Sequence, residues 1–390
     1  MKIFRVFLLL LFSLNSFAQT DSCNLEISLL TCGPGQELYS LFGHSAIRVK
    51  EKSTNRDIVF NYGTFDFDDP DFYTKFTRGK LLYFVSTSSF NDFIYEYQYE
   101  GRSVIEQVLN LSCEEKEKLL TALRTNAKEE NKYYHYDFVF DNCSTRLRDI
   151  LEKNNTTFND FLQGEHPSFR DMIHEYLDKG NQPWSKFGID LVLGSRLDKK
   201  ASDYQAMFLP DYLMNGFDKA TINNKKLVAS TNTLLPYRAD FTASGGGKAD
   251  SSTENSSSGV NTPLIFTMLL CIIISILSFF KSNNALKILD FIYFFILGAL
   301  GFFLLFMWFG TDHQLCANNY NLLWALPTHL PVSFFILSKK TWVKKYFTVV
   351  NVFYLILILS WNWLPQGMNF AFFPLALTAG IRSFCISTKK

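Results

Sequence analysis

Hydrophobic and polar residues follow two different patterns along this chain of 390 residues. As far as residue 242 they are mixed as in a globular domain, whereas from Pro263 onward long runs of Phe, Leu, Ile and Trp are separated by short charged clusters. An apolar run of about 20 residues is long enough to cross a bilayer as a helix. The pattern therefore predicts a soluble half followed by a membrane half.

Short segments in the soluble half alternate between apolar and polar residues and predict β-strands at residues 24–30, 44–49, 58–62 and 81–86. Ser112 and Glu115 form a capping box ahead of a helix that runs to about residue 128. A second helix is expected over residues 169–177, before a stretch from 183 to 211 that Pro and Gly interrupt. Together these elements predict an α+β domain.

A further helix is predicted to begin at a cysteine. A turn ends the short apolar run 138–140, and the apolar positions after Cys143 are spaced as on one face of a helix through residue 153. Cys143 therefore lies in the first turn, where unpaired backbone N–H groups and the helix dipole stabilise a thiolate. Arg146 and Arg148, one turn on, are expected to add to that stabilisation.

A thiol nucleophile also needs a base, and histidine is the usual one. His44 is the favoured candidate among the six histidines because it opens a predicted strand directly after a glycine, where backbone can approach closely. His135 is the competitor and lies in an aromatic cluster, while His166 and His174 lie in polar helical or loop sequence.

Four of the seven cysteines lie in the soluble half, at positions 23, 32, 113 and 143, and the other three, Cys271, Cys316 and Cys385, lie in or beside the membrane segments. Four cysteines allow three full disulfide pairings, which the sequence leaves open. No CxxC motif is present, so neither a zinc ribbon nor a thioredoxin-like site is supported. For Cys143, a disulfide with Cys113 and a buried, inert thiol are the alternatives to a nucleophile.

The N-terminus has the features of a secretory signal peptide. Basic residues at positions 2 and 5 precede an apolar run over 6–14 and a small-x-small site that ends at Ala18. A signal peptide is therefore predicted over 1–18, with an uncleaved anchor as the alternative, and export places the soluble domain, 19–242, outside the cytoplasm. A Gly- and Ser-rich stretch over 243–263 predicts a flexible linker to the membrane domain, 264–390.

Five membrane spans are predicted, at about 264–280, 288–309, 322–337, 347–364 and 370–386. Lysines lie between the first two spans and between the third and fourth, and Arg382 and two lysines lie at the C-terminal end, whereas the other connections carry neither Lys nor Arg. Because cytoplasmic loops are enriched in basic residues, the soluble domain is expected outside and the C-terminus in the cytoplasm. Polar residues at the outer span ends either admit lipid or are ordinary interface residues: Asp312, His313, Gln366 and Asn369.

Charge and composition limit which molecules this protein is expected to bind. The formal net charge of +1 predicts no strong field for nucleic acid. An acidic run, Asp66, Asp68, Asp69 and Asp71, lacks the spacing of a calcium loop and is expected to be a solvated turn. Aromatic residues around it are expected to be core, with a lipid groove as the alternative: Phe65, Phe67, Phe72, Phe76 and Phe84. We expect no metal and no cofactor.

Several segments, in order along the chain, resemble one known family. They are LLTCGPG (29–35), LFGHSAIRV (41–49), NYGTFDFDDPDF (61–72), KFTRGKLLYF (75–84), YDFVFDNCSTRLRDIL (136–151), PWSKFGIDLVLGSRLD (183–198) and MFLPDYL (207–213) in the soluble half, with NYNLLWALP (319–327) and QGMNFAFFPL (366–375) in the membrane half. The family is the Lnb N-terminal periplasmic domain family, found in bacterial lipoprotein N-acyltransferases. It belongs to the circularly permuted papain-like group, with the NlpC-like and lecithin:retinol acyltransferase proteins.

The resemblance implies a circularly permuted papain-like domain followed by an all-α membrane domain. It implies Cys143 as nucleophile, His44 as general base and, as orienting third residue on the next strand, Asn61, with Tyr62 as the other polar residue there. The alternative for Asn61 is a residue that merely ends a strand in a turn. Oxyanion donors would include the Cys143 backbone N–H.

The activity implied is thiol-dependent N-acylation of lipoproteins through a thioester, in the inner (cytoplasmic) membrane with the catalytic domain in the periplasm. The acyl donor is left open between a phospholipid and the lipoprotein's own diacylglyceryl group. Two other hypotheses are kept. One is an NlpC-like peptidase or amidase that uses the same residues to cut cell-wall peptides, and the other is a non-enzymatic, membrane-anchored binding module with Cys143 in a disulfide.

Overall fold

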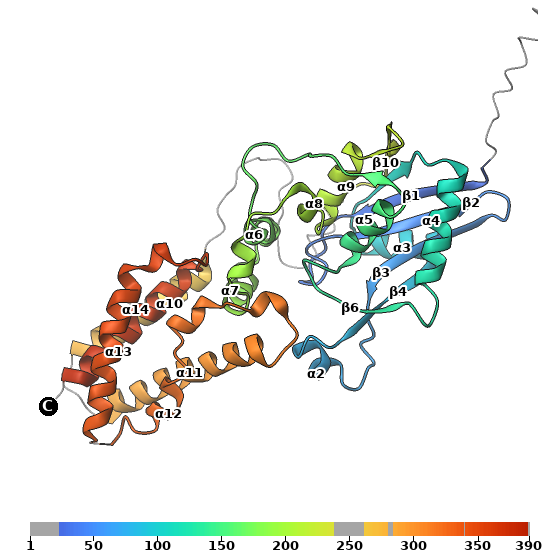
Figure 1. Ribbon diagram of the computed structural model, residues 1–390. Coiled ribbons are helices and arrows are strands. Elements are labelled where there is room, and N and C mark those ends of the chain that lie inside the picture. Colours follow the sequence, from blue (N-terminus) through green and yellow to red (C-terminus); the bar gives the residue numbers. More distant parts are fainter. Residues whose placement is uncertain (1–22, 238–260, 280–283, 339, 389–390) are drawn as a thin grey trace, which may run out of the picture.

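The computed structural model describes residues 23–237, 261–279, 284–338 and 340–388 (Figure 1). It contains a sheet-rich domain followed by a helical domain, in agreement with the predicted α+β domain and all-α membrane domain. The predicted signal peptide over 1–18 and nearly all of the predicted linker over 243–263 lie outside the described residues.

An antiparallel sheet of seven strands forms the centre of the first domain, in the order β10-β5-β1-β2-β3-β4-β6. The strands are β1 (Leu25–Cys32), β2 (His44–Glu51), β3 (Arg56–Thr64), β4 (Leu82–Ser89), β5 (Val104–Leu109), β6 (Tyr133–His135) and β10 (Val228–Leu235). The four strands predicted from alternation correspond to β1 to β4. A small second sheet joins β7 (Thr156–Thr157), β8 (Thr221–Ile222) and β9 (Lys225–Lys226).

Helices cover both faces of the large sheet, which explains why most residues of β1 and β2 are buried. On β1, Leu29 packs into a cluster with residues of α4 (Cys113–Asn126), α5 (Cys143–Glu152) and α9 (Pro210–Lys219). The next residue, Leu30, points to the opposite face and packs with α3 (Phe90–Tyr99). Successive side chains of a strand point to opposite faces, so each face of β1 contributes to a different core.

The predicted capping box at the start of α4 is present: Ser112 Oγ accepts from the Glu115 backbone N–H, and Glu115 accepts from that of Ser112. Two helices of the first domain, α6 (Phe169–Lys179) and α7 (Pro183–Val192), lie toward the second domain (Figure 1). They are followed by η1 (Ser195–Asp198) and α8 (Asp203–Ala206).

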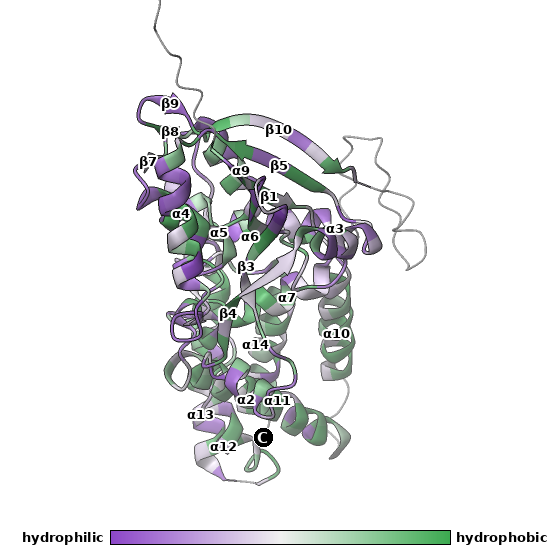
Figure 2. Cartoon of the chain, turned by 90° about the vertical axis from the view of Figure 1, so that its right-hand side faces the viewer, coloured by the Kyte–Doolittle hydropathy of each residue, from purple (hydrophilic) through white to green (hydrophobic). Residues whose placement is uncertain are grey.

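The second domain is built from α10 (Thr262–Phe279), α11 (Asn284–Phe309), α13 (Thr341–Leu359) and α14 (Phe373–Thr388). Three segments are long and apolar enough to cross a membrane, at Ala285–Phe309, Thr341–Leu359 and Phe370–Thr388, and α10 contributes a shorter apolar helix. Figure 2 shows that hydrophobic residues dominate these helices, whereas hydrophilic residues are frequent on α3 and α4 of the first domain.

The expected span over 322–337 is wrong as a single helix. This segment contains the end of η4 (Tyr320–Leu323) and the short helix α12 (His329–Ser333). Pro327 and Pro331 explain the break, because proline lacks the backbone N–H that a continuous helix needs and its ring clashes with the preceding turn. Non-helical backbone at membrane depth is tolerated where protein surrounds it. The broken segment packs against α11, and its own residues Trp324 and Ala325 are buried in the core of the helical domain.

Arg382 lies inside the helical domain instead of marking its cytoplasmic end. Its guanidinium is fully buried, and Nε donates to Asp290 Oδ1 at 2.6 Å while Nη1 donates to Ser278 Oγ at 2.6 Å. A buried arginine paired in this way fixes helix packing. Orientation of the membrane domain therefore depends on the lysines of the connections.

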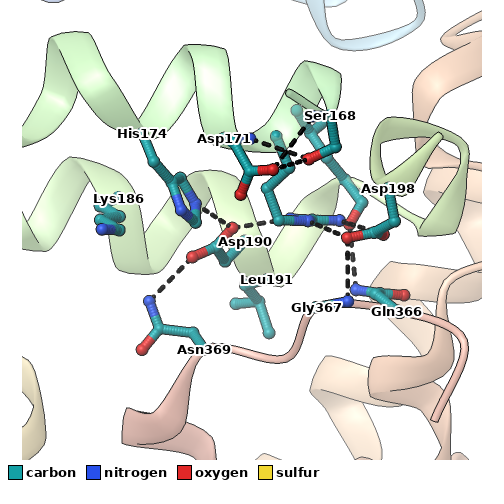
Figure 3. Close-up of polar contacts among 12 residues, drawn as sticks. Ser168, Asp171, His174, Lys186, Asp190, Leu191, Asp198, Gln366, Gly367 and Asn369 are labelled. Atoms are coloured by element: carbon teal, nitrogen blue, oxygen red, sulfur yellow. Dashed lines mark hydrogen bonds and ion pairs between the residues drawn. The ribbon is translucent and has the colours of Figure 1, made fainter. Parts of the chain in front are cut away.

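A polar network joins the two domains (Figure 3). Asp190 of α7 accepts from Arg170 Nη1 at 2.7 Å and from His174 Nε2 at 2.8 Å, both on α6. On the membrane side, Asn369 Nδ2 donates to Asp190 Oδ2 at 2.9 Å, and Gln366 Nε2 donates to the Leu193 carbonyl. We call these contacts the interdomain network. They fix the orientation of the soluble domain relative to the helical domain.

Candidate active site

Cys143 is the first residue of α5, as the sequence predicts. Its neighbour Asn142 is the buried N-cap: Oδ1 accepts from the Thr145 N–H at 2.9 Å, and Thr145 Oγ1 accepts from the Asn142 N–H at 2.8 Å. The remaining amide protons of Asn142 donate to the carbonyls of Phe138 and Phe208, at 2.7 and 2.8 Å. These bonds fix the helix start, so the thiol has a defined position.

His44 opens β2, directly opposite Cys32 of β1. The preceding residue, Gly43, has a φ of +78°, and a Cβ there would lie 2.6 Å from the Cys32 carbonyl oxygen. Only glycine fits such a close approach in the left-handed region. The glycine therefore turns the chain sharply into β2 and sets where the imidazole begins.

Asn61 lies on β3, the neighbouring strand, where it pairs with Ala46. Its Oδ1 accepts a hydrogen bond from His44 Nε2 at 3.3 Å. With Nε2 occupied in this way, Nδ1 is the ring nitrogen left for the thiol. The structure thus brings the three predicted residues, Cys143, His44 and Asn61, together from three different elements, with His44 contacting both of the others.

The electrostatics of Cys143 and His44 are coupled. Burial raises the pKa of the Cys143 thiol, but the charge of His44 and its hydrogen bond outweigh burial and lower that pKa below its usual value. Conversely, burial lowers the pKa of His44, yet the charge of Cys143 and hydrogen bonds to Cys143 and Asn61 raise it overall. Both shifts favour a thiolate beside an imidazolium, which is the reactive form of a cysteine nucleophile.

Gly63 lies beside the thiol. It has a φ of +90° and lies where the pairing of β3 with β4 is irregular, between Asn61 and Thr64. A Cβ on this glycine would stand 3.8 Å from the Cys143 Cβ and 3.7 Å from the Tyr136 ring, which is ordinary contact distance. The positive φ favours glycine there, and any larger side chain would lie against Cys143 and Tyr136.

Tyr134 is a buried residue of the site that the sequence analysis missed. Its hydroxyl is 3.9 Å from where a Gly63 Cβ would be, and it has no hydrogen-bond partner among the residues that the structure describes. Burial raises the pKa of the Tyr134 hydroxyl above its usual value, and the charge of Cys143 raises it further. The hydroxyl therefore keeps its proton and is a donor directed at the space beside the thiol. The aromatic cluster around His135 contains this tyrosine and was the one sequence signal that pointed to it.

Two buried serines connect the cysteine helix to the histidine strand. Ser45 Oγ and Ser144 Oγ lie 3.0 Å apart, and Ser144 Oγ lies 3.9 Å from Cys143 Sγ. A backbone hydrogen bond from Ser45 also lowers the pKa of the Cys143 thiol, although burial and His44 have larger effects on it. The residue after each member of the dyad thus holds the two elements together.

Other candidates lie away from the thiol or are engaged elsewhere. Arg146 forms a two-bonded ion pair with Asp141 and stacks on Tyr134, and Arg148 pairs with Asp149, so both arginines are committed to other partners. The expectation that they stabilise the thiolate directly is therefore not supported. His135 is exposed on β6. The two remaining candidates bind elsewhere: His166 contacts the Ala201 carbonyl, and His174 belongs to the interdomain network.

Cys143 is a free, half-buried thiol, so it is neither in a disulfide with Cys113 nor sealed in the core. Within the described ranges there is no group of three or more His, Cys, Asp or Glu residues placed to hold a metal ion. In the acidic run, Asp69 pairs with Lys75 at 2.7 Å, and Asp66 and Asp69 accept from nearby backbone N–H groups. These contacts are those of a solvated turn.

Two family models match the chain. The Lnb N-terminal periplasmic domain matches residues 14–178, a range that contains His44, Asn61 and Cys143, and the Lnb transmembrane domain matches residues 254–390. The chain belongs to the Lnb family. No curated protein and no solved structure matches it. Lnb membership makes it a membrane protein with a periplasmic N-terminal domain, in a family of lipoprotein-modifying enzymes.

Proposed function

We propose that this Lnb protein is a thiol-dependent acyltransferase that N-acylates the N-terminal lipidated cysteine of bacterial lipoproteins. The observation that carries the proposal is the pair of Cys143, at the start of α5, and His44, held by Asn61, with a lowered thiol pKa and a raised imidazole pKa. Such a pair suits attack on an acyl carbon.

In the first half-reaction, the Cys143 thiolate attacks the carbonyl carbon of a lipid ester. A C–S bond forms, the ester C–O bond breaks, and the His44 imidazolium gives its proton to the departing alkoxide. The products are a lysolipid or lyso-glyceryl alcohol, a thioester on Cys143 and a neutral imidazole. Asn61 is the positioning residue that holds the ring for this transfer.

In the second half-reaction, the free α-amine of the lipidated cysteine attacks the thioester carbon. The neutral His44 takes a proton from the amine, the C–N bond forms, and the C–S bond breaks to release the Cys143 thiolate. The imidazolium and thiolate are regenerated, and the net change is ester plus amine giving amide plus alcohol. No cofactor is needed to balance either step.

Both half-reactions pass through a tetrahedral oxyanion, which needs hydrogen-bond donors. The backbone N–H of Cys143, at the first position of α5, is one donor group, because the first N–H groups of a helix have no partner within it. The Tyr134 hydroxyl supplies a second, since it is buried, protonated and directed at the same space.

The membrane domain supports this substrate assignment over the alternatives. A peptidase that cuts cell-wall peptides would not need its catalytic domain fixed to membrane helices, yet Asp190 and Arg170 connect the soluble domain to the segment around Asn369. The binding-module alternative gives no role to a free thiol beside a histidine. We place the protein in the inner membrane, with the lysine-rich connections and the C-terminus in the cytoplasm.

The test is to express the chain in bacterial cells that lack their own N-acylating enzyme and to analyse one lipoprotein by mass spectrometry. Wild type should give an N-acylated N-terminus, while Cys143→Ala and His44→Ala should leave the α-amine free at an unchanged protein level. Retained N-acylation in the Cys143→Ala cells would exclude the thiol mechanism. Cleavage of cell-wall peptides by a chain that ends at residue 242 would favour the peptidase alternative.

A further inference from the structure

We propose that residues 65–81, which connect β3 to β4 and include α2 (Phe72–Thr77), enter the outer interface of the bilayer and guide a phospholipid acyl chain to Cys143. We call this segment the aromatic loop. The inference rests on the proposed acyltransferase function and names the lipid route to the same site. For the phenylalanines of this loop, which were expected to be core residues, the proposal adopts the alternative of a lipid groove.

The aromatic loop has its own cluster of rings, in which Phe72 is buried. Phe65 and Phe67 lie 4.7 Å apart, Phe67 and Phe72 lie 5.0 Å apart, and Phe72 stacks on Phe76 at 6.1 Å. None of these four residues belongs to the hydrophobic clusters that the described residues form. The rings of the loop therefore pack chiefly against one another.

Much of this aromatic surface is exposed. Phe67 is 65% exposed, Phe76 is 51% exposed, and Tyr73 on α2 is 82% exposed. Soluble surfaces seldom expose contiguous apolar groups, and where they do, a membrane or a partner usually covers them. Aromatic rings are enriched where a protein meets the interfacial layer of a bilayer.

Contacts between the aromatic loop and the membrane domain indicate what covers the exposed rings. The Arg78 carbonyl accepts from the Asp312 backbone N–H at 2.9 Å, and the Phe76 carbonyl accepts from His313 Nε2 at 2.9 Å. These residues directly follow α11, whose last residue, Phe309, is exposed and stacks on Trp308. Figure 1 shows α2 beside this end of α11.

The same rings continue toward the thiol. Phe65 contacts Tyr83 of β4 with ring centroids 5.3 Å apart, and Tyr83 stacks on Tyr136 at 4.3 Å. The Tyr136 ring and the Cys143 Cβ then face the same space over Gly63, at 3.7 and 3.8 Å from the position of a Cβ there. A continuous series of aromatic contacts thus leads from the end of a span to the nucleophile.

The charges of the aromatic loop limit how deeply it enters. Asp69 and Lys75 pair with each other, and Arg78 and Lys80 are exposed near the contact with α11. Basic side chains there suit phosphate headgroups, whereas the exposed aspartates must stay outside the hydrocarbon. An interfacial depth of about 5–10 Å is enough for exposed rings to meet acyl chains. Bulk phospholipid is the molecule that surrounds the end of a span, so we assign the loop to a phospholipid donor.

Lipid contact is tested without relying on catalysis. The full chain with Cys143→Ala is placed in phosphatidylethanolamine vesicles that contain a phospholipid with a diazirine at the end of one acyl chain, and photolabelled peptides are mapped. We expect labelling in residues 65–84 and at Tyr136. The further double change Phe67→Ser and Phe76→Ser should reduce labelling at Tyr136 at least fivefold. As a matched control, Tyr95→Ser and Tyr99→Ser remove two exposed, stacked tyrosines of α3 and should change nothing.

Labelling confined to the membrane helices, or unaffected by the Phe67→Ser and Phe76→Ser changes, would overturn the route. Labelling by a lipopeptide with the same diazirine in its diacylglyceryl chains, but not by the phospholipid, would overturn the assignment of the donor.

A second arm uses active protein and compares two rates at Cys143. The serine changes at Phe67 and Phe76 should slow acylation of Cys143 by vesicle lipid about tenfold or more but leave its alkylation by water-soluble iodoacetamide unchanged. Equal acylation rates would contradict the route. If Cys143 is never acylated in any variant although Tyr136 is labelled, the proposed chemistry fails while the lipid route stands.

Discussion

The imidazole of His44 and the amide of Asn61 meet across two neighbouring strands, with Nε2 3.3 Å from Oδ1. This contact selects which ring nitrogen faces Cys143. It also raises the pKa of His44, although burial and the charge of Cys143 have larger effects. The amide therefore influences both the orientation and the charge of the base.

Substitutions of Asn61 should show whether its amide controls the orientation and charge of His44 or only supports the strand. In Asn61→Ala the ring loses its acceptor, so we expect acyl transfer to fall about 100-fold, the cost of a misplaced catalytic group. Because Asn61 raises the pKa of His44, the alkaline limb of the pH–rate profile should move to lower pH. In Asn61→Asp, a carboxylate restores the acceptor and should move that limb to higher pH. A lower rate with an unchanged pH profile in both variants would show that Asn61 only supports the strand.

The reactivity of Cys143 should report the ion pair directly. In wild type, alkylation by iodoacetamide should remain fast below the usual thiol pKa, because the thiolate is stabilised by His44. In His44→Ala the effect of burial is unopposed by the imidazolium, so the midpoint of alkylation should move to higher pH. His135→Ala, which changes an exposed histidine of β6, is the control and should match wild type. Equal midpoints in all three proteins would exclude the dyad.

The change Tyr134→Phe is expected to lower activity without lowering stability. Removing one oxyanion donor typically costs about 10²–10³-fold in kcat, so Tyr134→Phe should lose activity by that factor. Its hydroxyl is buried without a partner among the described residues, and an unsatisfied group costs about 1–3 kcal/mol, so the variant should be at least as stable as wild type.

The control is Tyr62→Phe, in which the lost hydroxyl does have a partner, Asn126 Nδ2 at 2.9 Å. That change should lower the midpoint of thermal unfolding with little effect on kcat. If Tyr134→Phe instead loses stability and keeps its activity, the hydroxyl has a structural role only.

Local signals explain why the central residues of the site could be predicted. The turn after residue 140 and the apolar spacing beyond it predicted Cys143 at a helix start, and Gly43 predicted His44 at a strand start; the structure places both there. Each of these signals lies within a few residues of the position that it defines. The resemblance to Lnb proteins then linked the two residues, which lie far apart in the sequence.

Features that depend on distant contacts were missed. Strand β10 is mostly polar and exposed, and it exists because β5 pairs with it at the edge of the sheet. The position of Tyr134 beside the thiol depends on the pairing of β6 with β4. The apolar run over 322–337 has the composition of a span, but its prolines break the helix, and it buries Trp324 and Ala325 while Phe334 and Leu337 stay exposed. Its apolar composition did not specify a continuous helix.

The interdomain network predicts a specific effect on stability. Asp190 is buried and accepts from Arg170, His174 and Asn369 (Figure 3). Removing one partner of a buried ion pair typically costs about 3–5 kcal/mol, and Asp198 still pairs with Arg170, so Asp190→Asn should cost about 3 kcal/mol. The measurement is the midpoint of thermal unfolding of the full chain in detergent. Asp178→Asn breaks the exposed pair with Lys186 and should cost less than about 1 kcal/mol.

Acid should weaken the same contact. Burial alone would raise the pKa of Asp190, but His174, Arg170 and Asn369 lower it below its usual value of 3.8. A carboxylate whose pKa is lowered by folding contributes its stability above the usual value and loses it as the pH falls through the lowered one. Susceptibility of the α6–α7 region to protease should therefore stay constant from neutral pH to about 5 and rise below about 4. Asp190→Asn should be susceptible across the whole range. An acid rise of equal size in Asp190→Asn would assign the sensitivity to another carboxylate.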